Sequence, residues 1–166
     1  KPIVIYQSHT GFTEQYAHWT ASELSCPVIP LSSVTVDNLS PYDVVIFGGW
    51  VRAGLVMGLE KIKTFTPNLA AAFAVGTSPL TPQIIAEIQE RNGVGTLPIF
   101  YMQGGIRFEK LGFFYAALLR MAVKYIRRQD RKKNPTLATQ PVATVGSYDA
   151  SDKAAIQPLL DYITSR

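Results

Sequence analysis

Hydroxyl-bearing side chains gather around a glycine near the start of the sequence, and their types suit the binding of an anion. The segment reads Ser8-His9-Thr10-Gly11-Phe12-Thr13. It follows a short apolar run and opens a helical pattern, so loop amides and a helix N-terminus are expected to favour negative charge there. Hydroxyl and amide donors without a lysine suit a terminal phosphate monoester. The alternative is a Ser/Thr-rich cap that only begins a helix.

Other phosphate-binding and metal-binding patterns are missing from the sequence. A Walker loop needs G-x-x-x-x-G-K-[ST] and a dinucleotide fingerprint needs G-x-G-x-x-G, and neither occurs. Cys26 is the single cysteine, which excludes an internal disulfide framework and a tetrahedral zinc site built on thiolates. His9 and His18 lie far in sequence from any cluster of carboxylates, so we expect no metal.

Three glycine-containing segments directly follow apolar runs that are interpreted as strands. They read Gly48-Gly49-Trp50-Val51-Arg52-Ala53-Gly54, Gly76-Thr77-Ser78-Pro79-Leu80 and Gln103-Gly104-Gly105. In open α/β sheets, ligands bind outside the carboxyl ends of the strands, so these segments are candidate ligand-binding loops. Trp50 either stacks on a ligand or anchors its loop, and Arg52 faces either a ligand or solvent.

The elements that must position these loops alternate between apolar runs and amphipathic patterns. The sequence predicts strands at residues 2–6, 28–31, 43–47, 69–75 and 97–102. It predicts helices at residues 14–25, 58–65, 82–91, 110–128 and 150–163, with a short helix or turn at 34–39. Thr81 followed by Pro82 is typical of a helix start, and Asp149 or Ser151 is expected to cap the last helix. Continuously apolar strands that alternate with helices indicate a doubly wound, three-layer α/β fold with five parallel strands, in a single domain over residues 1–166.

Positive charge is concentrated in one segment. The whole chain has 166 residues and a net charge of +4, but residues 107–133 hold nine Lys or Arg against two acids, a balance of +7, which leaves −3 for the rest. Within it, the stretch from Leu111 to Lys133 combines an apolar, aromatic helix pattern with a basic end. Interfacial membrane helices have this pattern, although a helix packed on the sheet with a solvated basic end explains it equally well.

Composition narrows the class of protein further. With 47% hydrophobic and 17% charged residues, the chain is expected to be globular rather than disordered. No apolar run approaches the roughly 20 residues that span a bilayer, and no secretory signal is recognised. A lone cysteine suits a reducing compartment, so we expect a cytoplasmic protein. The basic run at 127–133 is the only support for a nucleic-acid binder, and no nucleic-acid-binding signature accompanies it.

The segment Tyr6-Gln7-Ser8-His9-Thr10-Gly11-Phe12-Thr13 resembles the phosphate loop of flavodoxins, and the spacing of the strands fits that family over essentially the whole chain. The resemblance implies FMN as the cofactor. It places the 5′-phosphate at Ser8, Thr10, Gly11 and Thr13, with His9 and Phe12 in variable positions. It places the isoalloxazine ring beside the segment from Gly49 to Gly54, the segment Gly76-Thr77-Ser78, and the glycines Gly104 and Gly105. Many flavodoxins carry a ring-stacking tyrosine in the region of residues 76–80, and this chain has no aromatic residue there. Either one ring face is open to a substrate or the difference has no functional meaning.

The pattern Gly104-Gly105-Ile106-Arg107-Phe108, followed by an aromatic helix, is similar to flavodoxin-type, menaquinone-linked protoporphyrinogen oxidases. The segment Val51-Arg52-Ala53-Gly54 resembles their flavin loop. This resemblance implies FMN-dependent oxidation of a reduced substrate, electron transfer to a quinone, and peripheral contact with the inner membrane face. No residue is identified as a catalytic acid or base.

Two readings of function therefore remain open. The first is an FMN-dependent, two-electron oxidoreductase that passes electrons to a quinone. The second is a one-electron carrier that docks on a redox partner protein, for which the basic segment requires an acidic partner or an anionic surface. A non-redox, nucleic-acid-binding module is disfavoured.

Overall fold

A computed structural model describes residues 1–107, 110, 117, 121 and 147–166. The chain divides into two compact units, of which the first comprises residues Lys1–Gly105 and Ala150–Arg166 and the second Ile106–Asp149. The helix predicted at 110–128 and the connection after it lie outside the described residues, except for single positions. The single-domain organisation therefore stays a prediction.

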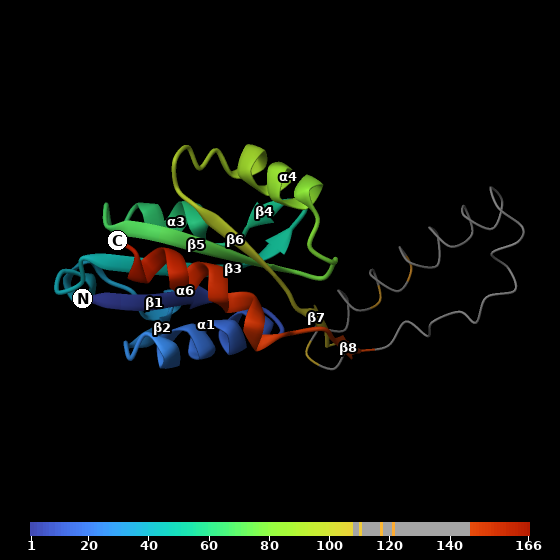
Figure 1. Ribbon diagram of the computed structural model, residues 1–166, viewed down its shortest axis with the longest axis horizontal. Helices are drawn as coiled ribbons and strands as arrows, with labels where there is room; N and C mark the ends of the chain where they lie inside the picture. The colour runs from blue at the N-terminus through green and yellow to red at the C-terminus, as the bar shows by residue number, and fades with distance from the viewer. Residues whose placement is uncertain (108–109, 111–116, 118–120, 122–146) are drawn as a thin grey trace, which may run out of the picture. The chain divides into compact units, whose positions relative to one another are not determined.

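Five parallel strands form the central sheet of the first unit (Figure 1). Their order across the sheet is β2-β1-β3-β5-β6, and the short β4 pairs with β3 at one end. The strands are β1 (Pro2–Gln7), β2 (Val28–Pro30), β3 (Val44–Arg52), β4 (Leu55–Val56), β5 (Leu69–Gly76) and β6 (Ile99–Gln103). All four pairings within this order are parallel, which confirms the predicted doubly wound α/β fold.

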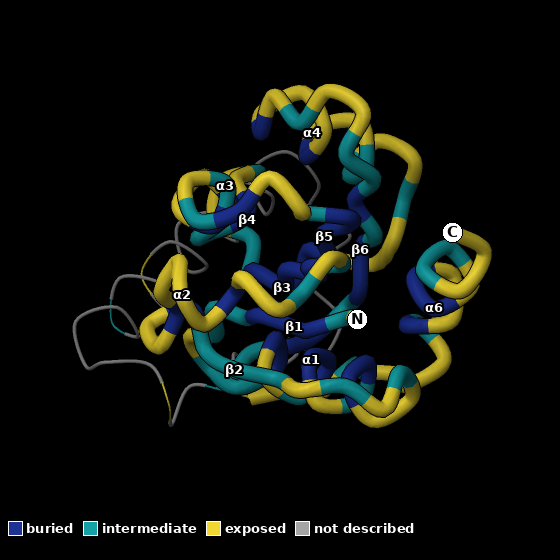
Figure 2. Tube along the Cα trace, turned by 90° about the vertical axis from the view of Figure 1, so that its left-hand side faces the viewer, coloured by how far each residue is buried: buried dark blue, intermediate teal, exposed yellow. Residues whose placement is uncertain are grey.

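Helices cover both faces of the sheet. The elements are α1 (Phe12–Glu23), α2 (Val36–Leu39), α3 (Leu59–Lys63), α4 (Pro82–Asn92) and α6 (Gln157–Thr164), with 3₁₀ turns η1 (Leu31–Ser33) and η4 (Lys153–Ile156). Two apolar clusters lie between the sheet and these helices. In the first, α2, α3 and α4 pack on one face of the sheet, and in the second, α1, η4 and α6 pack on the other. Figure 2 shows the strands buried between helices whose outer surfaces are exposed.

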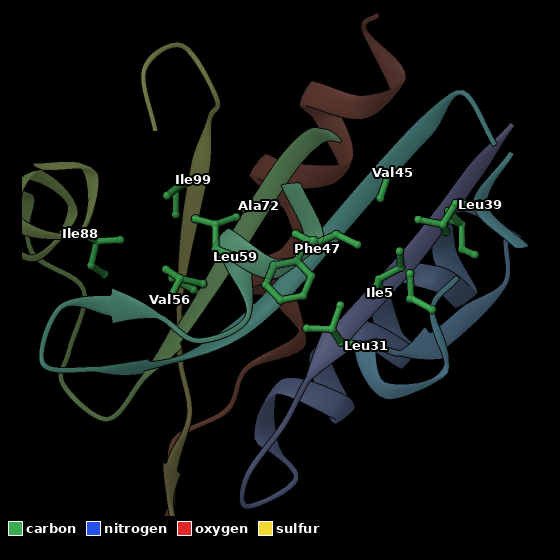
Figure 3. Packing of buried hydrophobic residues seen from close by; sticks show 14 of the residues in the cluster. Ile5, Leu31, Leu39, Val45, Phe47, Val56, Leu59, Ala72, Ile88 and Ile99 are labelled. Atoms are coloured by element: carbon green, nitrogen blue, oxygen red, sulfur yellow. The ribbon is translucent and has the colours of Figure 1, made fainter. Parts of the chain in front are cut away.

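Neighbouring residues of each strand serve opposite clusters because strand side chains alternate between faces. In β3, Val45 and Phe47 belong to the cluster beneath α3 and α4, while Ile46 belongs to the cluster beneath α1 and α6. Figure 3 shows Phe47 at the centre of the first cluster, with Leu59 and Val56 beside it. Since both faces of the sheet are buried over the central residues of the strands, those residues are apolar, which explains the continuous hydrophobic runs.

Two expected boundaries were wrong. The strand predicted to end at Gly48–Gly49 continues through Trp50 to Arg52, since Trp50 pairs with Val75 of β5 and Met57 N–H donates to Trp50 O at 2.9 Å. Pairing to a neighbour on each side overrides the low strand propensity of the glycines.

The last helix begins later than expected, and neither Asp149 nor Ser151 is its cap. Its 3₁₀ turn starts at Lys153, and the Asp152 side chain accepts from Ala154 N–H at 2.9 Å. At α4 the expected start is confirmed, because the Thr81 side chain caps the helix and Pro82 follows it.

The second unit is described only near its ends. A two-stranded sheet pairs β7 (Gly105–Ile106) with β8 (Tyr148–Asp149). Arg107 and Asp149 form an ion pair at 3.2 Å. Within the described part of the chain, no helix is long and apolar enough to cross a membrane.

The hydroxyl of Tyr16 bonds to two segments of the first unit, one just before the chain leaves this unit and one just after it returns. Tyr16 is fully buried in α1; its Oη donates to Gln103 O at 2.6 Å and accepts from Asp152 N–H at 3.0 Å. Beside it, Ala150 N–H donates to Gly104 O at 3.0 Å. One phenol therefore satisfies backbone groups at the end of β6 and at the start of η4.

We predict that Tyr16→Phe lowers the free energy of unfolding by about 1–2 kcal/mol, because the part-buried Gln103 carbonyl and Asp152 N–H both lose their hydrogen-bond partner. Urea denaturation of the full chain would measure this. Tyr42→Phe is the matched control, since no described residue accepts from or donates to the Tyr42 hydroxyl, and its effect should stay below about 0.5 kcal/mol. Equal effects of the two variants would contradict the role of Tyr16.

Candidate functional site

The carboxyl ends of β1, β3, β5 and β6 lie at one edge of the sheet, since these strands are parallel. All four candidate ligand-binding segments follow these ends. The topology therefore brings together residues from the loop after β1, the end of β3, the loop after β5 and the end of β6. These residues, from Ser8 to Gly104, are far apart in the sequence but lie at the same edge of the sheet.

The loop after β1 turns tightly into α1. Gly11 N–H donates to Ser8 Oγ at 3.1 Å, and Gly11 has φ of 95°, a left-handed conformation that favours glycine. Gly11 is also the N-cap of α1, and no side chain caps the helix there. The loop thus combines hydroxyl groups with the N-terminus of a twelve-residue helix.

Burial differs among the residues of this loop. Ser8, Thr10 and Gly11 are half-buried, and His9 is exposed. Thr13 and Phe12 are almost completely buried, at 1% and 3% exposure, so Phe12 acts as a core residue under the loop. Among the predicted phosphate ligands, Ser8 and Thr10 are therefore more accessible to a ligand than Thr13.

An acidic residue, Glu14, lies next to this loop, and its carboxylate accepts a hydrogen bond from a tyrosine. Tyr6 Oη donates to Glu14 Oε1 at 2.9 Å. Burial raises the pKa of the Tyr6 phenol, and the hydrogen bond and the charge of Glu14 raise it further. The phenol therefore stays protonated at neutral pH and donates its hydrogen bond to one oxygen of the Glu14 carboxylate.

The end of β3 and β4 form a hairpin rather than the loop predicted at residues 50–54. Val51 pairs with Val56, and Arg52 pairs with Leu55. The two residues of the turn, Ala53 and Gly54, have φ of 50° and 79°. Two positive φ values are what a type I′ turn requires, and Ala53 adopts one without the freedom of glycine.

The hairpin carries two side chains that can address a ligand. The Trp50 ring stacks on the His9 imidazole, with ring centroids 5.1 Å apart and an interplanar angle of 24°. Trp50 is half-buried and Arg52 is exposed. The predicted neighbourhood of the loop after β1 and the end of β3 is thus present, and the two meet through aromatic stacking.

Residues of β6 support the loop after β5. Tyr101 Oη donates to Ser78 O at 2.7 Å, and Gln103 Nε2 donates to Thr77 O at 3.4 Å. A Cβ on Gly76 would lie 2.4 Å from Tyr101 Oη, so the tyrosine requires a glycine there. Thr77, Ser78 and Leu80 are exposed around this support.

Gly104 and Gly105 are buried. Gly104 N–H donates to Gly76 O at 2.8 Å, and a Cβ on Gly104 would meet Phe12 and Val75 at 3.0 Å. Close packing at the sheet edge therefore favours a glycine at residue 104, independently of any contact with a ligand.

Cys26 lies between α1 and β2, at the amino end of the sheet. Burial raises the pKa of its thiol, and a backbone hydrogen bond involving Val4 lowers it by less. The thiol is protonated at neutral pH and lies away from the candidate site. Among the described residues, no group of His, Cys, Asp and Glu is placed to hold a metal ion.

Three supporting residues were missed by sequence reasoning: Tyr16, Tyr101 and Asn92. Each bonds to backbone groups far away in the chain, such as Asn92 to Gly54 and Val56. The sequence shows them only as polar residues within helix or strand patterns, and no motif marks their distant partners.

The donor set at this edge fits FMN. Hydroxyls and a helix N-terminus suit the phosphate, and Trp50 suits an aromatic ring. The loop residues 8–13, 49–54 and 76–81 include no carboxylate. No side chain of these loops therefore opposes an anionic ligand by its own charge.

The comparison with known protein families agrees with this fit. A family model described as a flavodoxin domain matches residues 3–136. No curated protein sequence matches the chain. Among solved structures, a flavodoxin from the domain Archaea is 21% identical with a TM-score of 0.41, covering 62% of this chain and 84% of its own. Flavodoxin 2 from Bacillus cereus is 18% identical with a TM-score of 0.46, again covering 62% and 84%.

A third solved structure, two-electron reduced Megasphaera elsdenii flavodoxin, is 14% identical with a TM-score of 0.41 and covers 61% of this chain and 82% of its own. The matching family model extends over well more than half of the sequence. The chain belongs to the flavodoxin domain family, and that membership implies FMN as its cofactor.

Proposed function

We propose that this protein is an FMN-dependent oxidoreductase that takes two electrons from a reduced organic substrate and passes them to a quinone. The observation that carries this proposal is the charge at the ring end of the site. Arg52 extends from the hairpin, and no described residue pairs with its guanidinium. A cation beside the ring, with no carboxylate in the adjoining loops, favours a flavin that holds two electrons as an anion.

The residues divide between the two ends of the cofactor. Ser8, Thr10, Gly11 and Thr13 hold the phosphate through hydroxyl and amide donors, with His9 and Phe12 completing the loop. The hairpin residues from Gly49 to Gly54, together with Gly76, Thr77 and Ser78, border the ring, and Gly104 and Gly105 close the edge. FMN supplies the redox chemistry when bound; the protein binds it, orients it and sets the charge around it.

The exposed loop after β5 supports an open approach to the ring. Thr77 and Ser78 are exposed, and no aromatic side chain occurs among residues 76–81. Tyr101 of β6 instead donates to Ser78 O of the loop. A substrate can therefore meet one face of the ring where many flavodoxins place a tyrosine.

The finer assignment follows the resemblance of residues 104–108 and 51–54 to menaquinone-linked protoporphyrinogen oxidases. We propose a porphyrinogen-like substrate, a quinone acceptor, and peripheral contact of residues 111–133 with an anionic membrane surface. Those residues lie largely outside the described part of the chain. The second candidate, a one-electron carrier for a redox partner protein, is favoured by the family match itself.

An anaerobic reductive titration of the FMN-loaded protein, followed by visible absorbance, separates the two candidates. The proposal expects direct bleaching to the two-electron reduced form, followed by rapid reoxidation on addition of a quinone. A long-lived half-reduced flavin, with no reoxidation by quinones, would instead identify a one-electron carrier.

The phosphate loop can be tested by binding alone. We expect Thr10→Ala to weaken FMN binding by about tenfold or more, because a hydroxyl hydrogen bond to a charged group contributes roughly 1.5–3 kcal/mol. Riboflavin binding, which involves no phosphate, should change much less. Flavin fluorescence titrations measure both, and unchanged FMN affinity would remove this loop from the site.

The charge of Arg52 can be tested by potentiometry. Arg52→Ala should lower the two-electron midpoint potential of bound FMN by about 20 mV, which corresponds to about 1 kcal/mol of lost stabilisation of the anionic reduced flavin. Arg52→Lys keeps the charge and serves as the control, with a smaller shift. If Arg52→Ala leaves the potential unchanged, Arg52 faces solvent and the charge argument fails.

A further inference from the structure

Asn92 is a buried amide at the last turn of α4, and it lies 38 residues along the chain from Gly54, the hairpin residue that it contacts. Only 9% of the residue is exposed. It is one of four polar residues that are buried in the described part of the chain. A buried amide is stable only when its donors and acceptor are satisfied, so its partners indicate what it holds in place.

Two of these partners belong to the flavin-side hairpin. Asn92 Oδ1 accepts from Val56 N–H at 2.9 Å, and Asn92 Nδ2 donates to Gly54 O at 2.8 Å. Nδ2 also donates to Ile88 O, one turn earlier in α4, at 2.7 Å. The single side chain therefore joins the turn and the return strand of the hairpin to the body of the helix.

The chemistry of the partners requires an amide. One partner is an N–H donor and two are carbonyl acceptors, so the side chain must accept at one atom and donate twice at the other. A carboxylate would keep the bond to Val56 but would face the carbonyls of Gly54 and Ile88 without a proton. An apolar side chain would leave all three backbone groups without this partner.

The hairpin turn also packs directly on α4. A Cβ on Gly54 would lie 2.2 Å from Arg91 Cδ and 3.1 Å from Glu87 Oε1. Arg91 and Glu87 are themselves joined, with Arg91 Nε 2.9 Å from Glu87 Oε1. The turn therefore lies against one face of the helix, and its carbonyl is directed to Asn92.

Fixing the return strand fixes the residues opposite it. Val56 pairs with Val51, Leu55 pairs with Arg52, and the next residue, Met57, donates to Trp50 O at 2.9 Å. A movement of Gly54 or Val56 would therefore be transmitted to the backbone of Trp50 and Arg52. These are the two side chains assigned to the ring.

The same helix also carries the loop after β5. Thr81 caps the start of α4, so residues 76–81 lead directly into the helix whose end holds the hairpin. α4 therefore connects two of the segments that border the ring. Asn92 is the point at which the second of them is attached.

We propose that Asn92 is a positioning residue for the ring end of the FMN site: by fixing the hairpin to α4, it sets the places of Trp50 and Arg52 relative to the flavin. This inference rests on the FMN site and is independent of the substrate and acceptor. Its effect should appear at the ring and leave phosphate recognition intact.

Asn92→Asp and Asn92→Ala test the proposal in the full chain. At saturating FMN, we expect both variants to shift the midpoint potential and to change the visible circular dichroism of bound flavin. Their affinity for FMN should fall by about tenfold, equivalent to about 1.4 kcal/mol. The ratio of FMN to riboflavin affinity, which reports the phosphate loop, should stay near that of the unchanged protein.

Asn68→Ala is the matched control. Asn68 Nδ2 also donates to a backbone carbonyl, that of Tyr42 at 3.2 Å, but Asn68 lies just before β5, at the amino end of the sheet. It should lower thermal stability without changing the flavin potential. If the Asn92 variants likewise lose only thermal stability, with potential and dichroism unchanged, Asn92 has a structural role alone and the proposal is wrong.

A measurement on the unchanged protein covers the case in which the variants fail to fold. Amide hydrogen exchange of Val56 should be slow in the free protein and slower with FMN bound, since the Asn92 hydrogen bonds and the flavin ring stabilise the same hairpin. Exchange of Val56 as fast as that of an exposed loop amide would overturn the proposal. Failure of the unchanged protein to bind FMN would instead refute the cofactor assignment itself.

Discussion

β3 lies at the centre of the sheet, and its pairing with β1 and β5 determines where every candidate binding loop lies. Six residues of β1 pair in register with β3, from Pro2 with Val44 to Gln7 with Gly49. On the other side, Gly48 pairs with Phe73, whose ring occupies the space that a Cβ on Gly48 would need. A side chain at residue 48 would displace Phe73, a fully buried core residue, and with it the alignment of the carboxyl ends.

The buried sheet also explains why the polar chemistry gathers at one edge. Both faces are covered by helices, so polar groups are tolerated only where strands end. The loop after β1, the hairpin that ends β3 and the loop after β5 meet at that edge, and β6 supports the last of them. Long-range hydrogen bonds from Tyr16, Tyr101 and Asn92 then hold the loops to the body.

The sequence was informative wherever a pattern is local. Continuous apolar runs predicted the five parallel strands, and Thr81-Pro82 predicted the start of α4. The end of β3 was missed because Gly48 and Gly49 resemble a strand terminator, while the pairing of Trp50 with Val75 is visible only in the fold. The start of the last helix was missed because Asp149, Ser151 and Asp152 are equally good caps by composition.

In the candidate site, too, local motifs were predictable from the sequence and contacts between distant residues were not. Its phosphate loop and its glycines are contiguous motifs, and the hydroxyl pattern around Gly11 indicated them from the sequence. The stacking of His9 on Trp50 and the attachment of the hairpin through Asn92 join residues that are tens of positions apart. Such partners have no local signature, so only the structure reveals them.

Comparing the binding of FMN and riboflavin to the same protein tests the central claim most directly, because the two ligands differ only in the phosphate. Isothermal titration calorimetry of the full chain should show binding of both, with FMN tighter by at least about tenfold, a difference of about 1.4 kcal/mol. Equal affinities would contradict the phosphate assignment at Ser8 and Thr10, and binding of neither ligand would contradict the flavin site as a whole.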